Sequence, residues 1–253
     1  MCAAPRNVDF VVVGLGNPGP EYAASRHNVG YIFCDYLATC IALQRSPQSV
    51  PTRPRFVRRG DLMADVHDVE IELPSSSPQK ASTAVRVLLV KPLTGMNDSA
   101  LAVTNVLRTY GVANPAKQLI CVFDDLNTLL GSIQLQNGGD LRSLSGHKGV
   151  ESIYALYPAF IRFRVGIGRP DSPATSIVGH VLGAFQQGKE MDLLGFALDQ
   201  CARALQMMVA LGGDTKDAKK TYAMSKKVPK NLAKLESLTF PVETVGLTIP
   251  PTT

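Results

Sequence analysis

The first thirty residues carry the feature that most limits how this chain can fold. Residues 10–13 (FVVV) form a short apolar run, which predicts a buried β-strand. The run ends in residues 14–20 (GLGNPGP), a turn with three glycines and two prolines in seven residues. Arg26, His27 and Asn28 follow, and apolar residues at helical spacing begin only after them. A strand that ends in a glycine-rich turn and then presents Asn and His is a common way to build a site.

The glycines of this turn also match the G-x-G-x-x-G fingerprint of dinucleotide-binding folds. That fingerprint needs a helix that opens within the motif and points its N-terminus at the pyrophosphate. Pro18 and Pro20 stand where the first turns of that helix would form, and proline inside a helix costs about 3 kcal/mol or more. Asp35 is only a weak candidate for the acidic residue that the fingerprint expects. The sequence therefore argues against a nucleotide site.

Length and composition predict one domain with a sizeable core, because the chain has 253 residues of which 45% are hydrophobic. No apolar run approaches the roughly 20 residues that a membrane helix needs. The segment before the first predicted strand is too short for an ordinary signal or transit peptide. The five cysteines are scattered without a C-x-x-C pair, which indicates reduced thiols. We expect a cytoplasmic protein, with a mitochondrial location as the alternative.

The net charge of +5 makes a polyanionic partner plausible. Residues 212–234 contain seven lysines against two aspartates. A second basic cluster consists of Arg53, Arg55, Arg58 and Arg59. A solvated helix face and a solubilising tail remain the alternative interpretation of these charges.

Predicted strands alternate with predicted helices along the chain. We expect strands over residues 9–14, 85–91, 118–124, 132–136 and 161–167, and a hairpin over 56–73. We expect helices over residues 28–43, 98–110, 149–157 and 191–211. This order predicts an α/β fold: a single-domain three-layer sandwich with a mixed, mostly parallel central sheet flanked by helices. We assign residues 9–223 to this domain and 224–253 to a basic, disordered C-terminal tail.

Polar side chains stand where three of these strands end. Asn17 follows the first strand, Met96 and Asn97 follow another, and Asp124 ends a third. Sites in such sheets lie beyond the C-terminal strand ends, so we expect these residues to converge, together with His27. A histidine oriented by a carboxylate is a good general base, and asparagines suit holding a water or polarising a carbonyl. The alternative is that His27 caps the following helix and Asp124 belongs to a turn.

Other common catalytic patterns are missing from the sequence. It has neither a G-x-S-x-G nucleophile elbow nor an H-E-x-x-H metal motif. Of its four histidines, His67 and His180 lie in segments that favour structural roles. We therefore expect no metal.

Six segments occur in an order that resembles a known family: GLGNPGPEYAASRHNVGY, KPLTGMNDSA, VFDDL with LLGSIQL, SGHKGV, RFRVGIGRP and VLGAF. Over about residues 9–223 the chain resembles the bacterial-type peptidyl-tRNA hydrolases. The resemblance implies a monomeric α/β enzyme that hydrolyses the ester between a peptide and the 3′ ribose of tRNA. It implies peptidyl-tRNA as the partner, with the ribosome as a further candidate, and neither a cofactor nor a membrane.

The same resemblance implies roles for individual residues. The family's base falls on His27, its orienting acid on Asp124, and its two positioning asparagines on Asn17 and Asn97. The remaining substrate-binding positions, in the peptide cleft, the loop around residue 147 and a phosphate clamp, fall on Tyr22, Asn28, Met96, His147, Lys148 and Arg164.

The sequence departs from the family pattern at three of these places. Lys148 stands where the family's GGHNG loop has Asn, and lysine can donate hydrogen bonds but cannot accept them. The loop before it looks about three residues longer than usual. Gln134 and Gln136 occupy the lysine positions of the phosphate clamp, and loss of a cation there should weaken the grip on the tRNA 5′ phosphate. These departures leave open a non-hydrolytic relative that binds RNA or a ribosome, similar to the chloroplast intron-splicing relatives.

Overall fold

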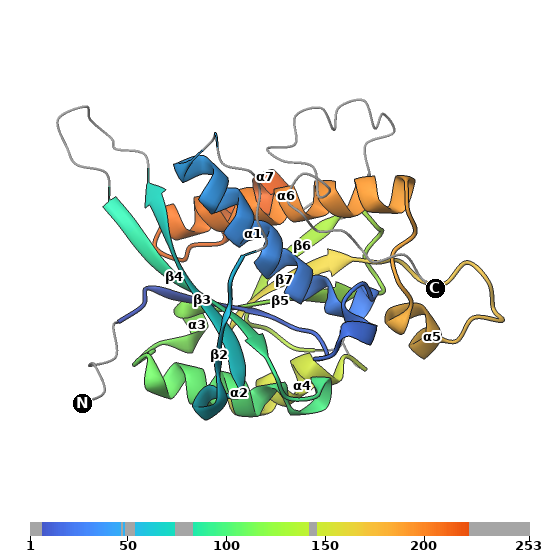
Figure 1. Ribbon diagram of the computed structural model, residues 1–253, viewed down its shortest axis with the longest axis horizontal. Helices are drawn as coiled ribbons and strands as arrows, with labels where there is room; N and C mark the ends of the chain where they lie inside the picture. The colour runs from blue at the N-terminus through green and yellow to red at the C-terminus, as the bar shows by residue number, and fades with distance from the viewer. Residues whose placement is uncertain (1–6, 47, 49–53, 74–82, 142–145, 223–253) are drawn as a thin grey trace.

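The computed structural model describes residues 7–46, 48, 54–73, 83–141 and 146–222. In this part of the chain a seven-stranded sheet lies between two layers of helices (Figure 1). The strands are β1 Phe10–Gly14, β2 Val57–Arg59, β3 Ala64–Leu73, β4 Thr83–Pro92, β5 Leu119–Asp125, β6 Ile133–Asn137 and β7 Ile161–Gly166. The helices are α1 Val29–Arg45, α2 Ser99–Thr109, α3 Pro115–Gln118, α4 Lys148–Leu156, α5 Ile177–Leu182, α6 Lys189–Ala210 and α7 Lys216–Tyr222.

The sheet has the strand order β2-β3-β4-β1-β5-β7-β6. Its central strands β4, β1, β5 and β7 are parallel, while β3 and β6 run antiparallel to their neighbours. Because β2 is antiparallel to β3, it runs in the same direction as the central strands. The predicted sandwich with a mixed, mostly parallel sheet is therefore confirmed.

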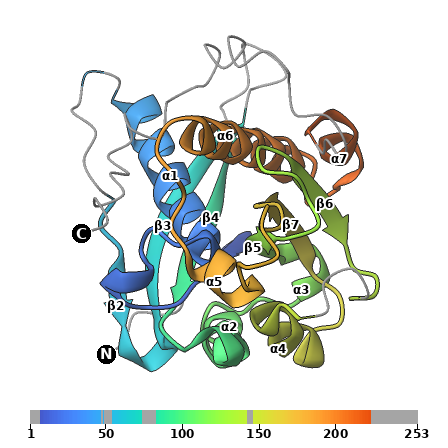
Figure 2. The ribbon, with the colours of Figure 1, turned by 90° about the vertical axis from the view of Figure 1, so that its right-hand side faces the viewer.

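Helices α1 and α6 cover one face of the sheet, and α2 and α4 cover the other (Figure 2). Strand β1 serves both layers, because Phe10 and Val12 pack toward α1 and α6 while Val11 and Val13 pack toward α2 and α4. Side chains of a strand alternate between faces, so a strand covered on both sides must be apolar throughout. This explains the continuous FVVV run.

The helix predicted over residues 191–211 is α6, and one apolar stripe along it is fully buried. Its members are Leu194, Leu198, Cys201, Leu205 and Met208, each with no exposed surface. Burial of such side chains contributes roughly 1.5–3 kcal/mol each. The helix ends before Gly212 and Gly213, whose φ angles of 64° and 93° suit glycine.

The glycine turn opens no helix of the dinucleotide-binding kind. Two short 3₁₀ turns, η1 Pro20–Tyr22 and η2 Arg26–Asn28, separate it from α1. Gly14 instead allows close packing of helix against strand, because a Cβ there would lie 2.1 Å from the carbonyl oxygen of Gly30. The turn therefore lacks the helix N-terminus that a dinucleotide site of this kind requires.

Three short helices were not predicted from the sequence, namely α3, α5 and α7. They have four to seven residues, too few for a periodic apolar pattern to emerge. The predicted disordered tail, residues 224–253, lies outside the described residues. Among the helices that the structure describes, none has the length and apolar character that crossing a membrane requires.

Candidate active site

The polar residues at the strand exits converge, as predicted, at one edge of the sheet. The three strands concerned, β4, β1 and β5, are neighbours, so their C-terminal ends share that edge. There a cavity of about 660 Å³ is lined by Asn17, His27, Asn97, Asp124 and His147, among others. Helix α5 lies in front of the strand ends (Figure 2) and forms part of the wall of the cavity.

His27 and Asp124 meet in this cavity. Nδ1 of His27 lies 2.8 Å from Oδ1 of Asp124, although the two residues are 97 positions apart in the chain. The backbone N–H of the preceding residue, Arg26, donates to the carbonyl of Gly183, and its guanidinium binds the carboxylate of Glu190. These contacts fix the short turn η2 that carries His27. The alternative of a capping role for His27 is not favoured, because its side chain caps neither η2 nor α1 in the structure.

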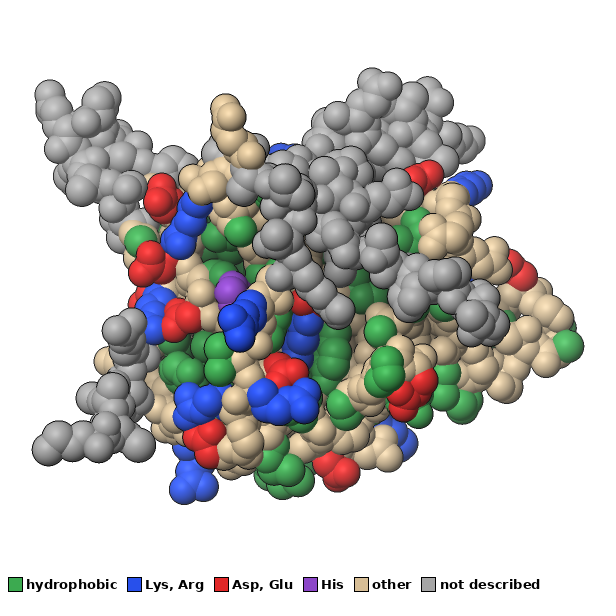
Figure 3. All heavy atoms as spheres, viewed as in Figure 1, with side chains coloured by type: hydrophobic (Ala, Val, Ile, Leu, Met, Phe, Trp, Pro, Cys, Tyr) green, Lys and Arg blue, Asp and Glu red, His purple; other side chains and the backbone are tan. Residues whose placement is uncertain are grey.

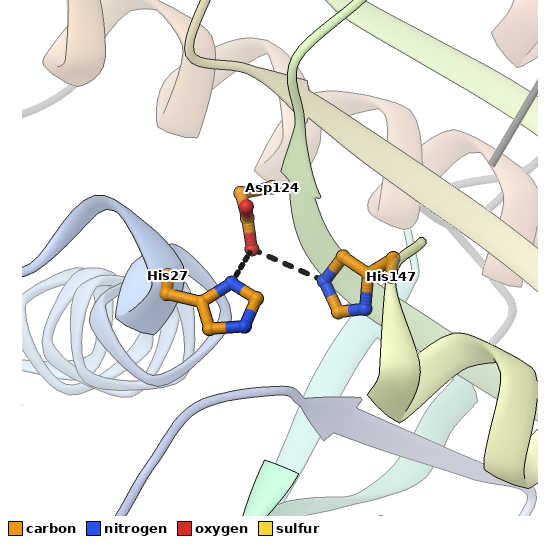
Figure 4. A group of neighbouring side chains, drawn as sticks. All are labelled: His27, Asp124 and His147. Carbon is orange, nitrogen blue, oxygen red and sulfur yellow. Dashed lines mark hydrogen bonds and ion pairs between the residues drawn. The ribbon is translucent and has the colours of Figure 1, made fainter. Parts of the chain in front are cut away.

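A second imidazole contacts the same carboxylate oxygen. Nε2 of His147 lies 3.1 Å from Oδ1 of Asp124 (Figure 4). His147 is the N-cap of α4, and its Nδ1 accepts the backbone N–H of Val150. Because Nδ1 is an acceptor, the proton of the neutral ring lies on Nε2 and is donated to Asp124. The sequence placed His147 in a substrate-binding loop through the resemblance alone, without this contact.

Asp124 is an ionised carboxylate at neutral pH. It is buried, with 4% of its surface exposed. Burial by itself would raise its pKa, but His147 and His27, by charge and by hydrogen bonding, outweigh that effect and hold the pKa below its usual range. A charged acceptor fixes the Nδ1–H tautomer of His27 and leaves Nε2 with a free lone pair. His27 is therefore set up to accept a proton from a group in the cavity.

Asn17 is held in place by Asn28 and by the backbone of Met96. Asn28 accepts the backbone N–H of Asn17 at 2.8 Å and donates to its carbonyl at 2.9 Å. Oδ1 of Asn17 accepts the backbone N–H of Met96 at 3.0 Å. With its oxygen engaged, Asn17 offers the cavity its NH₂ donors.

Asn28 itself does not line the cavity. It was expected in the peptide cleft, but only 1% of its surface is exposed and its amide is turned onto the backbone of Asn17. Its place in the structure is that of a positioning residue. Tyr22, also expected in the cleft, is half-buried at the end of η1 and is not among the residues that line the cavity. Met96 and Asn97 do line it, from the turn η4 Met96–Asp98.

Lys148 lies at the rim of the cavity as the first residue of α4. Its ammonium group is 2.9 Å from Oε2 of Glu151, and Glu151 also accepts the backbone N–H of Gly146 at 2.7 Å. The side chain of Lys148 is 63% exposed, so this ion pair is screened by water and weak. The lysine remains available to an anion that enters the cavity.

Arg164 does not reach the cavity. Its guanidinium is buried and donates to the carboxylate of Asp125 from Nε at 3.1 Å, with Nη2 at 2.8 Å from the same oxygen. The predicted role in a phosphate clamp would require a phosphate to compete with this buried ion pair. Gln134 lies directly across from Arg164 on the neighbouring strand, and Gln136 lies across from Arg162.

Two arginines of the cluster near residue 58 are paired with neighbouring acids. Arg58 is 3.0 Å from Asp65, and Arg59 is 2.6 Å from Asp61. Basic and acidic side chains are interspersed on this face of the molecule (Figure 3). This pairing favours the solvated-surface interpretation for that cluster.

An apolar wall of the cavity and a cation beside it were not predicted from the sequence. The wall comes from α5, through Ile177, Val178, Val181 and Leu182. The cation is Arg169, which donates to Asn127 at 2.7 Å. A signal for α5 was present, because Ser176 precedes the apolar IVGHVL segment and caps it by accepting the N–H of Gly179.

This geometry defines a class of protein. An imidazole oriented by a buried carboxylate faces an open cavity that also presents amide donors, with cations at the rim and an apolar wall. Such a site can activate water against a polarised carbonyl, so the class of protein that the fold and site define is a hydrolase built on a mixed, mostly parallel sheet.

Comparison with known proteins identifies the family. The family model for peptidyl-tRNA hydrolase matches residues 11–231, and the chain belongs to that family. The peptidyl-tRNA hydrolase of Moorella thermoacetica is 34% identical over 213 residues, which are 83% of this chain and 95% of the relative. That of Geobacter sp. (strain M21) is 36% identical over 204 residues, 80% of this chain and 92% of the relative.

Solved structures of peptidyl-tRNA hydrolases have the same fold as this chain. The crystal structure of peptidyl-tRNA hydrolase from Acinetobacter baumannii superposes with a TM-score of 0.65 at 28% sequence identity, covering 86% of this chain and 98% of that one. A complex of a peptidyl-tRNA hydrolase with n-propanol gives the same TM-score of 0.65.

Proposed function

We propose that the protein hydrolyses the ester bond of peptidyl-tRNA in this cavity, releasing the peptide and a free tRNA for reuse in translation. Family membership supports the reaction, and the pairing of His27 with Asp124 at an open cavity is the observation that carries its location. The curated relatives above bear the name of the enzyme, which favours hydrolysis over the non-hydrolytic, RNA-binding alternative.

In the proposed mechanism, His27 is the general base. Nε2 of His27 takes a proton from a water molecule while the water oxygen attacks the ester carbonyl carbon. Asp124 accepts the Nδ1–H bond and stabilises the imidazolium that forms. The imidazolium then returns its proton to the 3′ oxygen of the ribose, which leaves as the C–O bond breaks. General-base assistance of this kind typically contributes about 10²–10⁴-fold in rate.

The amide groups supply electrostatic stabilisation. The NH₂ group of Asn17 is fixed by Met96 and Asn28, so it can donate to the carbonyl oxygen as negative charge develops there. Asn97, on the neighbouring turn, suits holding the attacking water. Loss of one such preorganised donor costs roughly 10²–10³-fold in kcat.

The rim and wall of the cavity suit the two halves of the substrate. Lys148 and Arg169 place positive charge where the phosphates of the tRNA 3′ end would enter. The apolar side chains of α5, together with Met96, would contact the peptide. Tyr22 remains a candidate for the edge of the peptide cleft.

The domain bounds, the cellular location and the oligomeric state are proposed together with the enzymatic role. We propose that residues 9–223 form the catalytic domain and that the protein acts as a cytoplasmic monomer, with a mitochondrial location as the alternative and the ribosome as a further partner. Support comes from the match to bacterial enzymes over most of the chain.

A direct test is release of an N-blocked amino acid from charged tRNA. The wild-type protein should release it, and His27→Ala should be slower by at least about 10²-fold because the base is missing. His67→Ala is a matched control, since His67 lies on β3, which β4 separates from β1, and is not among the residues that line the cavity. Absence of release by the wild type would overturn the hydrolase assignment, and an unchanged rate in His27→Ala would overturn the choice of base.

A further inference from the structure

Three metal-ligating groups converge in the cavity although the sequence contains no metal motif. Nδ1 of His27, Nε2 of His147 and a carboxylate oxygen of Asp124 all lie within 4.8 Å of one another. They come from η2, the N-terminus of α4 and the end of β5, so no local spacing reveals them. Two imidazoles and one carboxylate are a common donor set for catalytic-type zinc sites with an open position.

We propose that His27, Asp124 and His147 form an inhibitory binding site for a borderline divalent metal ion, with Zn²⁺ as the physiological candidate. Metal binding follows from the geometry of these three residues, whereas the inhibition rests on the proposed function.

The distances suit the ion after small movements. Tetrahedral zinc with bonds of about 2.0–2.1 Å separates its ligand atoms by roughly 3.3 Å. Oδ1 of Asp124 lies 2.8 Å from His27 Nδ1 and 3.1 Å from His147 Nε2. The three ligand atoms lie within 4.8 Å of one another, so the carboxylate would have to move away from the rings and the two rings toward the ion. The cavity borders all three residues, so a water or hydroxide could complete the coordination.

Binding would change the tautomers of both rings. Each ring now places a proton on the nitrogen that faces Asp124, and a metal ion needs the lone pair of that nitrogen instead. The proton of His147 would move to Nδ1, where it competes with the N–H of Val150. That contact is 3.3 Å long, so little is lost when it breaks.

The same change would disable the base. When Nδ1 of His27 holds the ion, the ring carries its proton on Nε2, the nitrogen that should receive the proton of water. The metal would also separate Asp124 from His27, so no negative charge is left to stabilise an imidazolium. Metal binding therefore removes the general base on which the proposed mechanism depends.

The choice of metal follows from the ligands. Imidazole and carboxylate favour Zn²⁺ and its neighbours over Mg²⁺ or Ca²⁺, which require more oxygen ligands. Mg²⁺, which accompanies tRNA, should therefore not inhibit.

Co²⁺ provides a readout that does not depend on activity, because its visible d–d bands report ligand number and geometry. We would titrate the full-length protein with Co²⁺, and compare His147→Asn, Asp124→Asn and the control His67→Asn, each checked by circular dichroism for folding. The wild type and His67→Asn should show one intense low-coordinate band at 1:1 stoichiometry, without the thiolate charge-transfer band that cysteine would add. His147→Asn and Asp124→Asn should each weaken Co²⁺ binding by at least about tenfold, since even outer-shell changes cost 10–100-fold.

Zn²⁺ should displace Co²⁺ and, over the same concentration range, inhibit hydrolysis, and a chelator should restore it. No band in the wild type, or a band unchanged in His147→Asn, would overturn the site. A band as expected together with full activity at saturating Zn²⁺ would overturn the inhibition. If the protein hydrolysed no substrate but gave the expected titrations, the metal site would stand and the proposed function would fall.

Discussion

Gly30 is tightly packed against the strands that carry the site, and substituting it tests how precisely His27 must be placed. Gly30 is the second residue of α1. A Cβ there would lie 2.3 Å from the backbone nitrogen of Leu15 and 2.3 Å from the carbonyl oxygen of Val122. Those two groups are hydrogen-bonded to each other at 2.9 Å, so the methyl group would press on a bond between β1 and β5. Neither neighbour is a flexible side chain that can turn away.

In Gly30→Ala, the start of α1 must therefore move. Opening 2.3 Å to the minimum of 3.0 Å that real Cβ atoms show requires a shift of about 0.7 Å. His27 lies three residues earlier in the adjoining turn, so a shift of this size would stretch its 2.8 Å hydrogen bond to Asp124 to about 3.5 Å, the limit of such a bond. A misplacement of about 1 Å can cost roughly 10²-fold in rate, which corresponds to about 2.7 kcal/mol of transition-state stabilisation.

Stability should fall by less than activity. Overpacking costs about 1–3 kcal/mol, while alanine regains up to about 1 kcal/mol of helix propensity over glycine. We would measure kcat/KM for release of an N-blocked amino acid, together with urea unfolding. Gly60→Ala is the control, because a Cβ at Gly60 meets nothing within 4 Å. A folded Gly30→Ala protein with kcat/KM within about threefold of wild type would refute the argument that this contact positions the base.

Three further predictions concern charge. The pKa of Asp124 is lowered in the folded state, so its carboxylate stabilises the protein above the unfolded pKa of about 3.9, and this contribution is lost as the pH falls through the folded value. Unfolding measured from pH 6 to 2 should therefore be less acid-sensitive in Asp124→Asn than in wild type. An identical pH dependence of the two proteins would contradict the lowered pKa. Lys148→Asn should raise turnover if the lysine hinders the water or ester, while a loss of turnover with a higher KM would mean that the loop has adapted to the cation. If the lysines of residues 212–234 bind tRNA, the affinity for tRNA should depend less on salt when the exposed Lys216, Lys219 and Lys220 of α7 are replaced with Gln. The slope of the logarithm of the binding constant against the logarithm of the salt concentration should flatten by about 0.9 per lost phosphate contact. An unchanged slope measured by filter binding would reject that role.

The apolar runs by themselves determined most of the fold. A continuous run such as FVVV can be satisfied only where both faces are covered, which requires a central strand between two helix layers. Parallel central strands end at a common edge of the sheet, so the sequence alone could group Asn17, Met96 and Asp124, which lie at or just after the ends of β1, β4 and β5.

Tertiary structure alone decided what each polar group does. The sequence could not show that Arg164 turns inward to Asp125, because a strand residue's face depends on its neighbours' register. It could not show that Asn28 turns away from the cavity to hold Asn17, or that His147 donates to the oxygen that already binds His27. These contacts join residues 11 to 97 positions apart. No periodic pattern encodes such contacts, because which donor reaches which acceptor depends on the packing of whole helices and strands against one another.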